Sequence, residues 1–159
     1  METAGRLIPF QVHEEYRKQS SPEMHLYKLQ DGRLQVVTEG RLPMLLCGPF
    51  YILAQNKLAL FLQACSIPNF STKPAEVFRR ADGKRWQSHY ELIVNDELFP
   101  GSISSVDARG YRLWHFRSSH LFVSPELRDR LMSDFPELQY SPGFRGFYGI
   151  PSDELERGE

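Results

Sequence analysis

The side chains best able to act as a base or a metal ligand in this chain are five histidines. They are His13, His25, His89, His115 and His120. None belongs to an HxH, HxxxH or HExxH motif, and Cys47 and Cys65 are not at zinc-ligand spacing, so the sequence predicts no metal site. His115 and His120, with Asp107 nearby in sequence, could supply an acid–base pair. A small histidine-dependent hydrolase or transferase is therefore kept as one alternative.

The chain lacks the usual motifs for a nucleophile or a phosphate-binding loop. No serine lies in GxSxG, and neither GxxxxGK[ST] nor GxGxxG occurs. Cys47 precedes Gly48 and Pro49, where a helix N-terminus would favour a reactive thiolate. Its apolar neighbours at 44–46 favour a buried structural thiol instead. We therefore predict a protein that is not an enzyme and that needs no cofactor.

One segment, residues 73–90, combines basic and aromatic side chains. Its members are Lys73, Phe78, Arg79, Arg80, Lys84, Arg85, Trp86 and Tyr90. Such a surface can stack bases and hold phosphates, or it can dock an acidic protein surface. It can also be a hairpin whose charges protect a sheet edge. Because the formal net charge is −1, nothing attracts nucleic acid in general, and a nucleic-acid-binding module ranks below a protein-binding one.

Two hairpins should position this segment and the chain before it. Asp-Gly turns at 31–32 and 82–83 join strands expected at 25–30 and 33–38, and on either side of the second turn within 77–94. The second hairpin alternates with period two. Trp86, Ser88, Tyr90, Leu92 and Val94 share its more apolar face, and Gln87, His89, Glu91 and Ile93 share the other.

Two helices are expected beside these strands. The first should begin at Gly48 and Pro49 and end at Cys65. Its inward face would be Phe50, Leu53, Ala54, Leu58, Phe61, Leu62 and Cys65. The second follows strands at 111–116 and 121–123, with Ser124 as N-cap and Pro125 as first residue, and it continues to Asp134. Its apolar face would be Leu127, Leu131 and Met132, with Phe135 beyond.

Length and composition limit the architecture. A chain of 159 residues with 41% hydrophobic and 25% charged residues is enough for one packed domain and excludes a disordered chain. We predict an α+β domain over 1–159, with a mainly antiparallel, hairpin-built sheet packed against two principal helices. Residues 1–20 and the acidic tail 152–159 are expected to be flexible. With no apolar run of membrane length and no signal peptide pattern, we expect a cytoplasmic protein with reduced thiols.

Three stretches resemble, in order and spacing, a class of bacterial immunity proteins associated with polymorphic toxin systems. They are YILAQNKLALFLQA at 51–64, YELIVNDE at 90–97 and LFVSPELRDRL at 121–131. The class combines a helix, a strand pair, and a final strand that passes through Phe-Val-Ser into a helix. The resemblance covers the last two thirds of the chain.

The resemblance implies a cytoplasmic protein that binds a cognate toxin and neutralises it by forming a stoichiometric complex. A standard interface takes about 800 Å² from each partner, which a domain of this size can supply. Candidate anchors follow from composition, because arginine and large aromatic residues are enriched among energetic hot spots. They are Arg85, Trp86, Tyr111, Arg112 and Trp114, with Phe144, Arg145, Phe147 and Tyr148 from a glycine-rich C-terminal loop.

Overall fold

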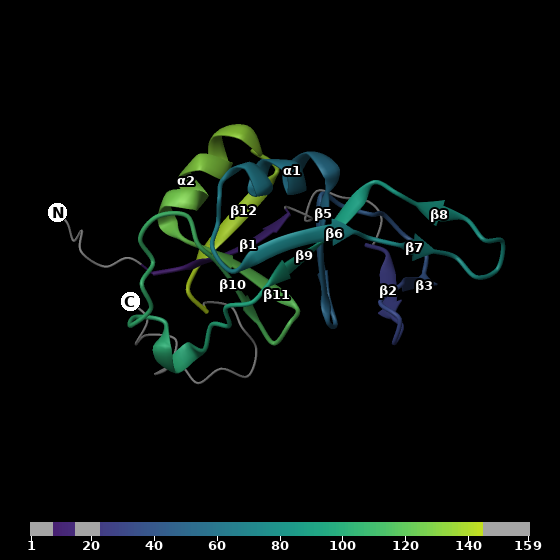
Figure 1. The fold of residues 1–159 in the computed structure, drawn as a ribbon, viewed down its shortest axis with the longest axis horizontal. Helices are drawn as coiled ribbons and strands as arrows, with labels where there is room; N and C mark the ends of the chain where they lie inside the picture. Colours follow the sequence, from purple (N-terminus) through teal and green to yellow (C-terminus); the bar gives the residue numbers. More distant parts are fainter. Residues whose placement is uncertain (1–7, 15–22, 145–159) are drawn as a thin grey trace.

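The computed structural model describes residues 8–14 and 23–144, and it has the predicted α+β architecture (Figure 1). The elements in chain order are β1 Phe10–Glu14, β2 His25–Lys28, β3 Leu34–Thr38, β4 Leu45–Gly48, β5 Tyr51–Gln55, α1 Asn56–Ala64, β6 Phe70–Pro74, β7 Val77–Phe78, β8 Arg85–Trp86, β9 His89–Val94, the 3-10 turn η1 Pro100–Ser102, β10 Leu113–Phe116, β11 His120–Val123, α2 Pro125–Asp134 and β12 Leu138–Pro142.

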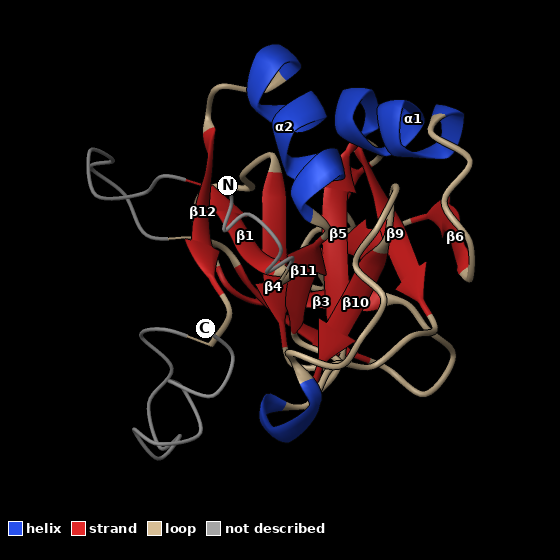
Figure 2. Cartoon of the chain, turned by 90° about the vertical axis from the view of Figure 1, so that its left-hand side faces the viewer, coloured by secondary structure: helices blue, strands red, loops and turns tan. Residues whose placement is uncertain are grey.

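The strands form three four-stranded sheets where we expected one. Their orders are β10-β11-β1-β12, β4-β5-β9-β6 and β2-β3-β7-β8. Pairing is antiparallel in every one of these ladders except that of β3 with β7, so the mainly antiparallel character is confirmed. Both helices lie on the same side of the first two sheets, as Figure 2 shows. The third sheet extends away from the helices, at the right of Figure 1.

The helix predicted from Pro49 to Cys65 is wrong in its first third. Residues 45–55 instead form the β4–β5 hairpin, and α1 begins only at Asn56. Strand β5 is buried on both faces. Ile52 and Ala54 join the core beneath the helices, while Tyr51 and Leu53 join a second core against the β2-β3-β7-β8 sheet. A strand buried on both faces has a continuous apolar sequence, which periodicity alone does not separate from a buried helix.

The two Asp-Gly hairpins are confirmed, but the long strand predicted after the second turn is divided. Gly32 and Gly83 take positive φ angles of 94° and 74°, whereas Asp31 and Asp82 do not, so neither is the two-residue turn in which both central positions have positive φ. Strand β8 then stops at Trp86, and β9 begins at His89 in another sheet. His89 and Glu91, assigned to the less apolar face, are buried. Glu91 lies beside Leu53 on the side of the sheet that packs against the β2-β3-β7-β8 sheet, from which Lys28 reaches it.

Helix α2 has the predicted bounds, but two of its residues behave differently from the prediction. Ser124 makes no side-chain cap hydrogen bond; its hydroxyl donates to the Gly110 carbonyl at 2.6 Å and accepts from the Arg112 amide at 2.9 Å. The serine therefore ties the preceding loop to the start of the helix. Met132, expected on the apolar face, is 52% exposed.

The expected flexibility of residues 1–20 is wrong for Phe10–Glu14. This segment is strand β1, which pairs with β11 on one side and β12 on the other. It is therefore an interior strand of its sheet, and Val12 is buried in the helix-covered core. The expected flexible tail, 152–159, lies outside the described residues.

Candidate functional site

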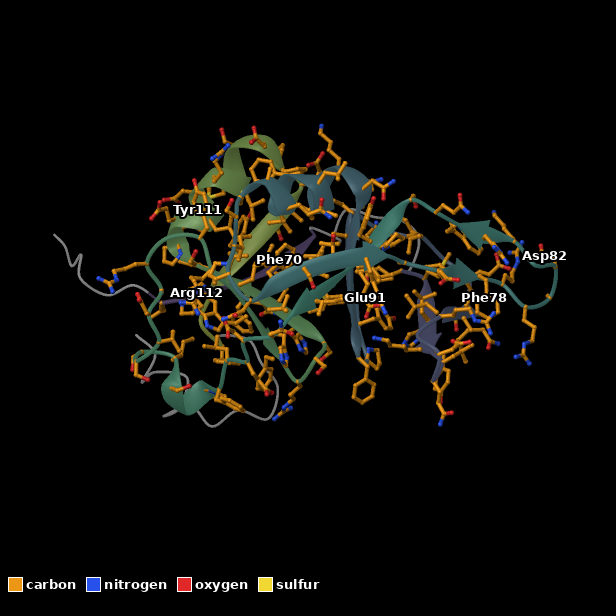
Figure 3. All side chains as sticks on the ribbon, viewed as in Figure 1. Phe70, Phe78, Asp82, Glu91, Tyr111 and Arg112 are labelled. Carbon is orange, nitrogen blue, oxygen red and sulfur yellow. The ribbon has the colours of Figure 1, made fainter. Side chains whose placement is uncertain are left out.

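A groove of about 410 Å³ lies between the β7–β8 hairpin and the start of β9. We call it the hairpin groove, and its lining residues are Arg33, Asn56, Pro74, Ala75, Glu76, Val77, Phe78, Gly83, Arg85, Trp86, Gln87, His89 and Tyr90. The hairpin projects from the body of the molecule, with Asp82 at its tip and Phe78 along its stem (Figure 3). Grooves of this size, with aromatic walls and a few polar groups, are typical of binding sites.

Strand register decides which side chains face solvent at this hairpin. Val77 pairs with Trp86, and Phe78 pairs with Arg85. Val77 is 1% exposed and packs in the core with Trp86 against it. Alternation along the strands therefore places Phe78 and Arg85 on the opposite, outer face.

The outer face continues across the neighbouring strands. Gln35 pairs with Phe78 in the parallel β3–β7 ladder, and Tyr27 pairs with Gln35 across β2 and β3. Tyr27 is 63% exposed. A row from Tyr27 through Phe78 to Arg85 thus crosses all four strands of the sheet, with its aromatic and guanidinium groups on the side away from the core.

Cations stack on the aromatic rings of the hairpin. The Arg33 guanidinium lies 4.8 Å from the centre of the Phe78 ring. The Lys84 ammonium lies 4.8 Å from the centre of the Trp86 ring, with Arg79 at 5.8 Å. These contacts hold the two rings in fixed positions beside the groove.

Among the four cations of the β7–β8 hairpin, Arg79 is already paired within the protein. Arg79 contacts Asp82 at 2.6 Å and also pairs with Glu39. The hydrogen bond from Arg79 holds the pKa of the Asp82 carboxyl well below its usual range. Arg80 and Arg85, by contrast, pair with no carboxylate in residues 8–14 and 23–144. Arg85 is exposed, so on the outer face of the hairpin it offers a guanidinium to a partner.

Arg33 is held by an aspartate of its own turn, as Arg79 is held by Asp82. Its guanidinium contacts Asp31 at 2.8 Å, and the Arg33 amide donates to the same carboxyl at 3.0 Å. Both hydrogen bonds lower the pKa of Asp31, and the one from the Arg33 backbone amide has the larger effect. Arg33 was not among the predicted residues; it reaches the groove because β3 pairs with β7, a contact between distant segments that no local pattern indicates.

Of the predicted anchors, only Arg85 and Trp86 line the hairpin groove. Trp114 and Phe144 are each 2% exposed and belong to a third core, so a partner cannot reach them. Residues Arg145, Phe147 and Tyr148 lie outside the described residues.

The other two anchors, Tyr111 and Arg112, lie at the opposite end of the molecule from Phe78 and Asp82 (Figure 3). The Arg112 guanidinium contacts Asp96 at 3.0 Å, donates to the Asp107 carbonyl at 3.1 Å and stacks over Trp114. The Tyr111 hydroxyl accepts a hydrogen bond from Arg130 at 3.2 Å. Both side chains therefore make contacts within the protein.

His115 lies in β10 and His120 begins β11, on either side of the turn at 117–119, and they do not form an acid–base pair. His115 Nδ1 accepts a hydrogen bond from the Ser118 amide at 3.1 Å, and His120 Nδ1 lies 3.1 Å from the Ser119 hydroxyl. Burial lowers the pKa of His120. The hydrolase alternative gains no support from this geometry.

Neither metal-binding or membrane-spanning features nor similarity to known proteins identifies the function of this chain. Among the described residues, no three His, Cys, Asp or Glu side chains are grouped to hold a metal ion. No helix in residues 8–14 and 23–144 has the length and apolar character needed to cross a membrane. Comparison with protein-family models, with curated proteins and with solved structures found no match.

Proposed function

We propose that this protein is an immunity protein that neutralises a cognate toxin in the cytoplasm by binding it through the hairpin groove. The observation that carries the proposal is the exposed Arg85, which pairs with no carboxylate among the described residues, at the edge of a 410 Å³ groove that Trp86 also lines. Tryptophan and arginine are the residues that most often dominate the free energy of protein association. The resemblance of residues 51–131 to toxin-immunity proteins supports the same function.

The charge distribution favours a protein partner over nucleic acid. Arg79 and Arg33 are paired with carboxylates, which leaves Arg80, Lys84 and Arg85 as the cations of the hairpin without an ion pair among the described residues. Three such contacts would give a dependence of affinity on salt of about three units of slope, since each phosphate contact contributes about one unit. An acidic side chain of a protein partner, bound at the hairpin, needs no larger number of unpaired cations.

The test is co-expression with the product of the adjacent gene, followed by calorimetry on the purified pair. Trp86→Ala and Arg85→Glu should each weaken binding by about thirty-fold or more, as expected for hot-spot residues, and abolish protection from toxicity. Arg109→Glu is the matched control, because Arg109 is exposed, does not line the hairpin groove and pairs with the exposed Asp107. Absence of a complex, or equal affinity for all three variants, would reject the proposal.

A nucleic-acid-binding assay tests the second candidate function. Binding of single-stranded DNA that weakens steeply with salt and is lost in Arg80→Ala and Arg85→Ala would favour the nucleic-acid-binding module instead.

A further inference from the structure

A second groove, of about 300 Å³, lies along the other end of β9 and shares no lining residue with the hairpin groove. We call it the Glu91 groove. Its lining residues are Lys28, Phe50, Tyr51, Ile52, Lys73, Glu91, Leu92, Ile93, Val94, His115 and Ser118. In Figure 3 Glu91 lies near the middle of the molecule, between the helix-covered sheets and the hairpin.

Two hairpin tips border this groove, and both have strained backbones. Phe50 in the β4–β5 loop has φ of 68°, and Arg117 and Ser118 in the β10–β11 turn have φ of 55° and 56°. Positive φ is rare for residues other than glycine, and for a bulky side chain it is an outlier that requires an explanation. Such strain concentrates at binding and switch sites, where the surrounding structure maintains it.

Phe50 is held in this conformation with its ring in solvent. Its side chain is 70% exposed, the largest exposure among the large hydrophobic side chains of the described residues. Lys28 Nζ donates to the Phe50 carbonyl at 3.2 Å and to Glu91 Oε2 at 2.6 Å. Lys28 therefore connects the strained loop to a buried carboxylate on β9.

One ammonium of the groove lacks a close partner. Glu91, 5% exposed, is already bound by Lys28. Lys73, opposite Glu91 in the β6–β9 ladder, has its Nζ 3.8 Å from Glu91 Oε1, and no hydrogen bond joins it to any residue in the described part of the chain. Its side chain is 50% exposed. Two ammonium groups thus share one carboxylate, so the groove has an excess positive charge.

We propose that the Glu91 groove binds an acidic segment of a partner protein that also carries apolar residues. A carboxylate of that segment pairs with Lys73, and an apolar side chain packs against the Phe50 ring and the half-buried Ile93. The excess positive charge of the groove favours a carboxylate. The exposed Phe50 ring, which lines the same groove as Ile93, favours an apolar side chain beside that carboxylate. The site goes beyond the proposed toxin contact, which uses a different groove and different residues.

The test uses a fluorescein-labelled peptide of alternating glutamate and leucine, with its glutamine counterpart as matched probe, in fluorescence anisotropy with the full chain. The acidic peptide should bind at least about ten-fold more tightly than the glutamine peptide. Lys73→Gln and Phe50→Gly should each weaken binding by about five-fold or more. Leu60→Ala, an exposed apolar residue on α1, is the control and should leave binding unchanged.

Phe50→Gly also separates binding from folding. Glycine accepts the positive φ without strain, so this variant should keep its thermal midpoint while losing the peptide. Equal binding of the two peptides, no binding up to about 1 mM, or unchanged affinity in both groove variants would overturn the inference. None of these results depends on Arg85 or Trp86, so failure here and failure of the toxin contact are distinguishable.

Discussion

The backbone at Phe50 should reverse the usual stability order of alanine and glycine. Its φ is 68°, and its side chain is 70% exposed. The left-handed conformation costs an L-residue about 1–2 kcal/mol, whereas glycine adopts it freely. Glycine also gives the unfolded chain more freedom, which costs about 0.4–1 kcal/mol. We therefore expect Phe50→Gly to have a free energy of unfolding about 0.5–1 kcal/mol higher than that of Phe50→Ala.

The comparison is clean because both substitutions remove the same ring, so the ring's contacts cancel. Urea denaturation followed by far-UV circular dichroism gives the two free energies. Leu60, 53% exposed on α1, is the matched control site. There alanine should be more stable than glycine by about 1 kcal/mol, as in any exposed helix interior. If alanine is also at least as stable as glycine at position 50, the strain argument for the Glu91 groove is refuted.

Three further predictions concern stability and reactivity. Gly48→Ala should destabilise the fold by about 1–3 kcal/mol in urea denaturation, because an added Cβ would overlap the ring of Tyr51, which is 2% exposed and cannot move aside; an unchanged midpoint would contradict this packing. Lys28→Met should cost about 1–3 kcal/mol by leaving the buried Glu91 without its close partner, and the double variant Lys28→Met with Glu91→Leu should recover part of the loss, which a double-mutant cycle measures. Burial raises the pKa of the Cys47 thiol to about 12, so its thiolate form should be scarce at pH 8, and in a Cys65→Ser variant Ellman's reagent should modify Cys47 much more slowly in the native than in the unfolded protein; equal rates would disprove this.

The sequence predicts best those elements whose signals are local. The Asp-Gly turns and the Ser124-Pro125 helix start each depend on residues adjacent in the chain, and the structure has both hairpins and α2 at those positions. The capping contact of Ser124 was nevertheless wrong, because the loop carrying Gly110 competes for the same hydroxyl. A local signal fixed where the helix begins but could not indicate which distant backbone groups the serine would bond.

Elements whose character depends on burial were harder to predict. Residues 51–54 are all buried, so the apolar run had no polar face from which to distinguish strand from helix. Glu91 was placed on the less apolar face of its strand by alternation, yet it is buried, and Lys28 from another sheet compensates its charge.

The candidate site was predicted only in part for a similar reason. Arg85 and Trp86 stand out by composition, but Arg33 reaches the groove through the β3–β7 pairing, and Trp114 is in the core. Composition selects residues that are able to bind; only the fold decides which of them a partner can reach.

The position of strand β1 has a consequence for synthesis of the chain. Phe10–Glu14 leaves the ribosome well before its two neighbours, β11 and β12. Until Leu138–Pro142 has left the exit tunnel, β1 cannot complete its pairing. Closure of the β10-β11-β1-β12 sheet joins segments that are far apart in sequence, so it should be the slow step of folding.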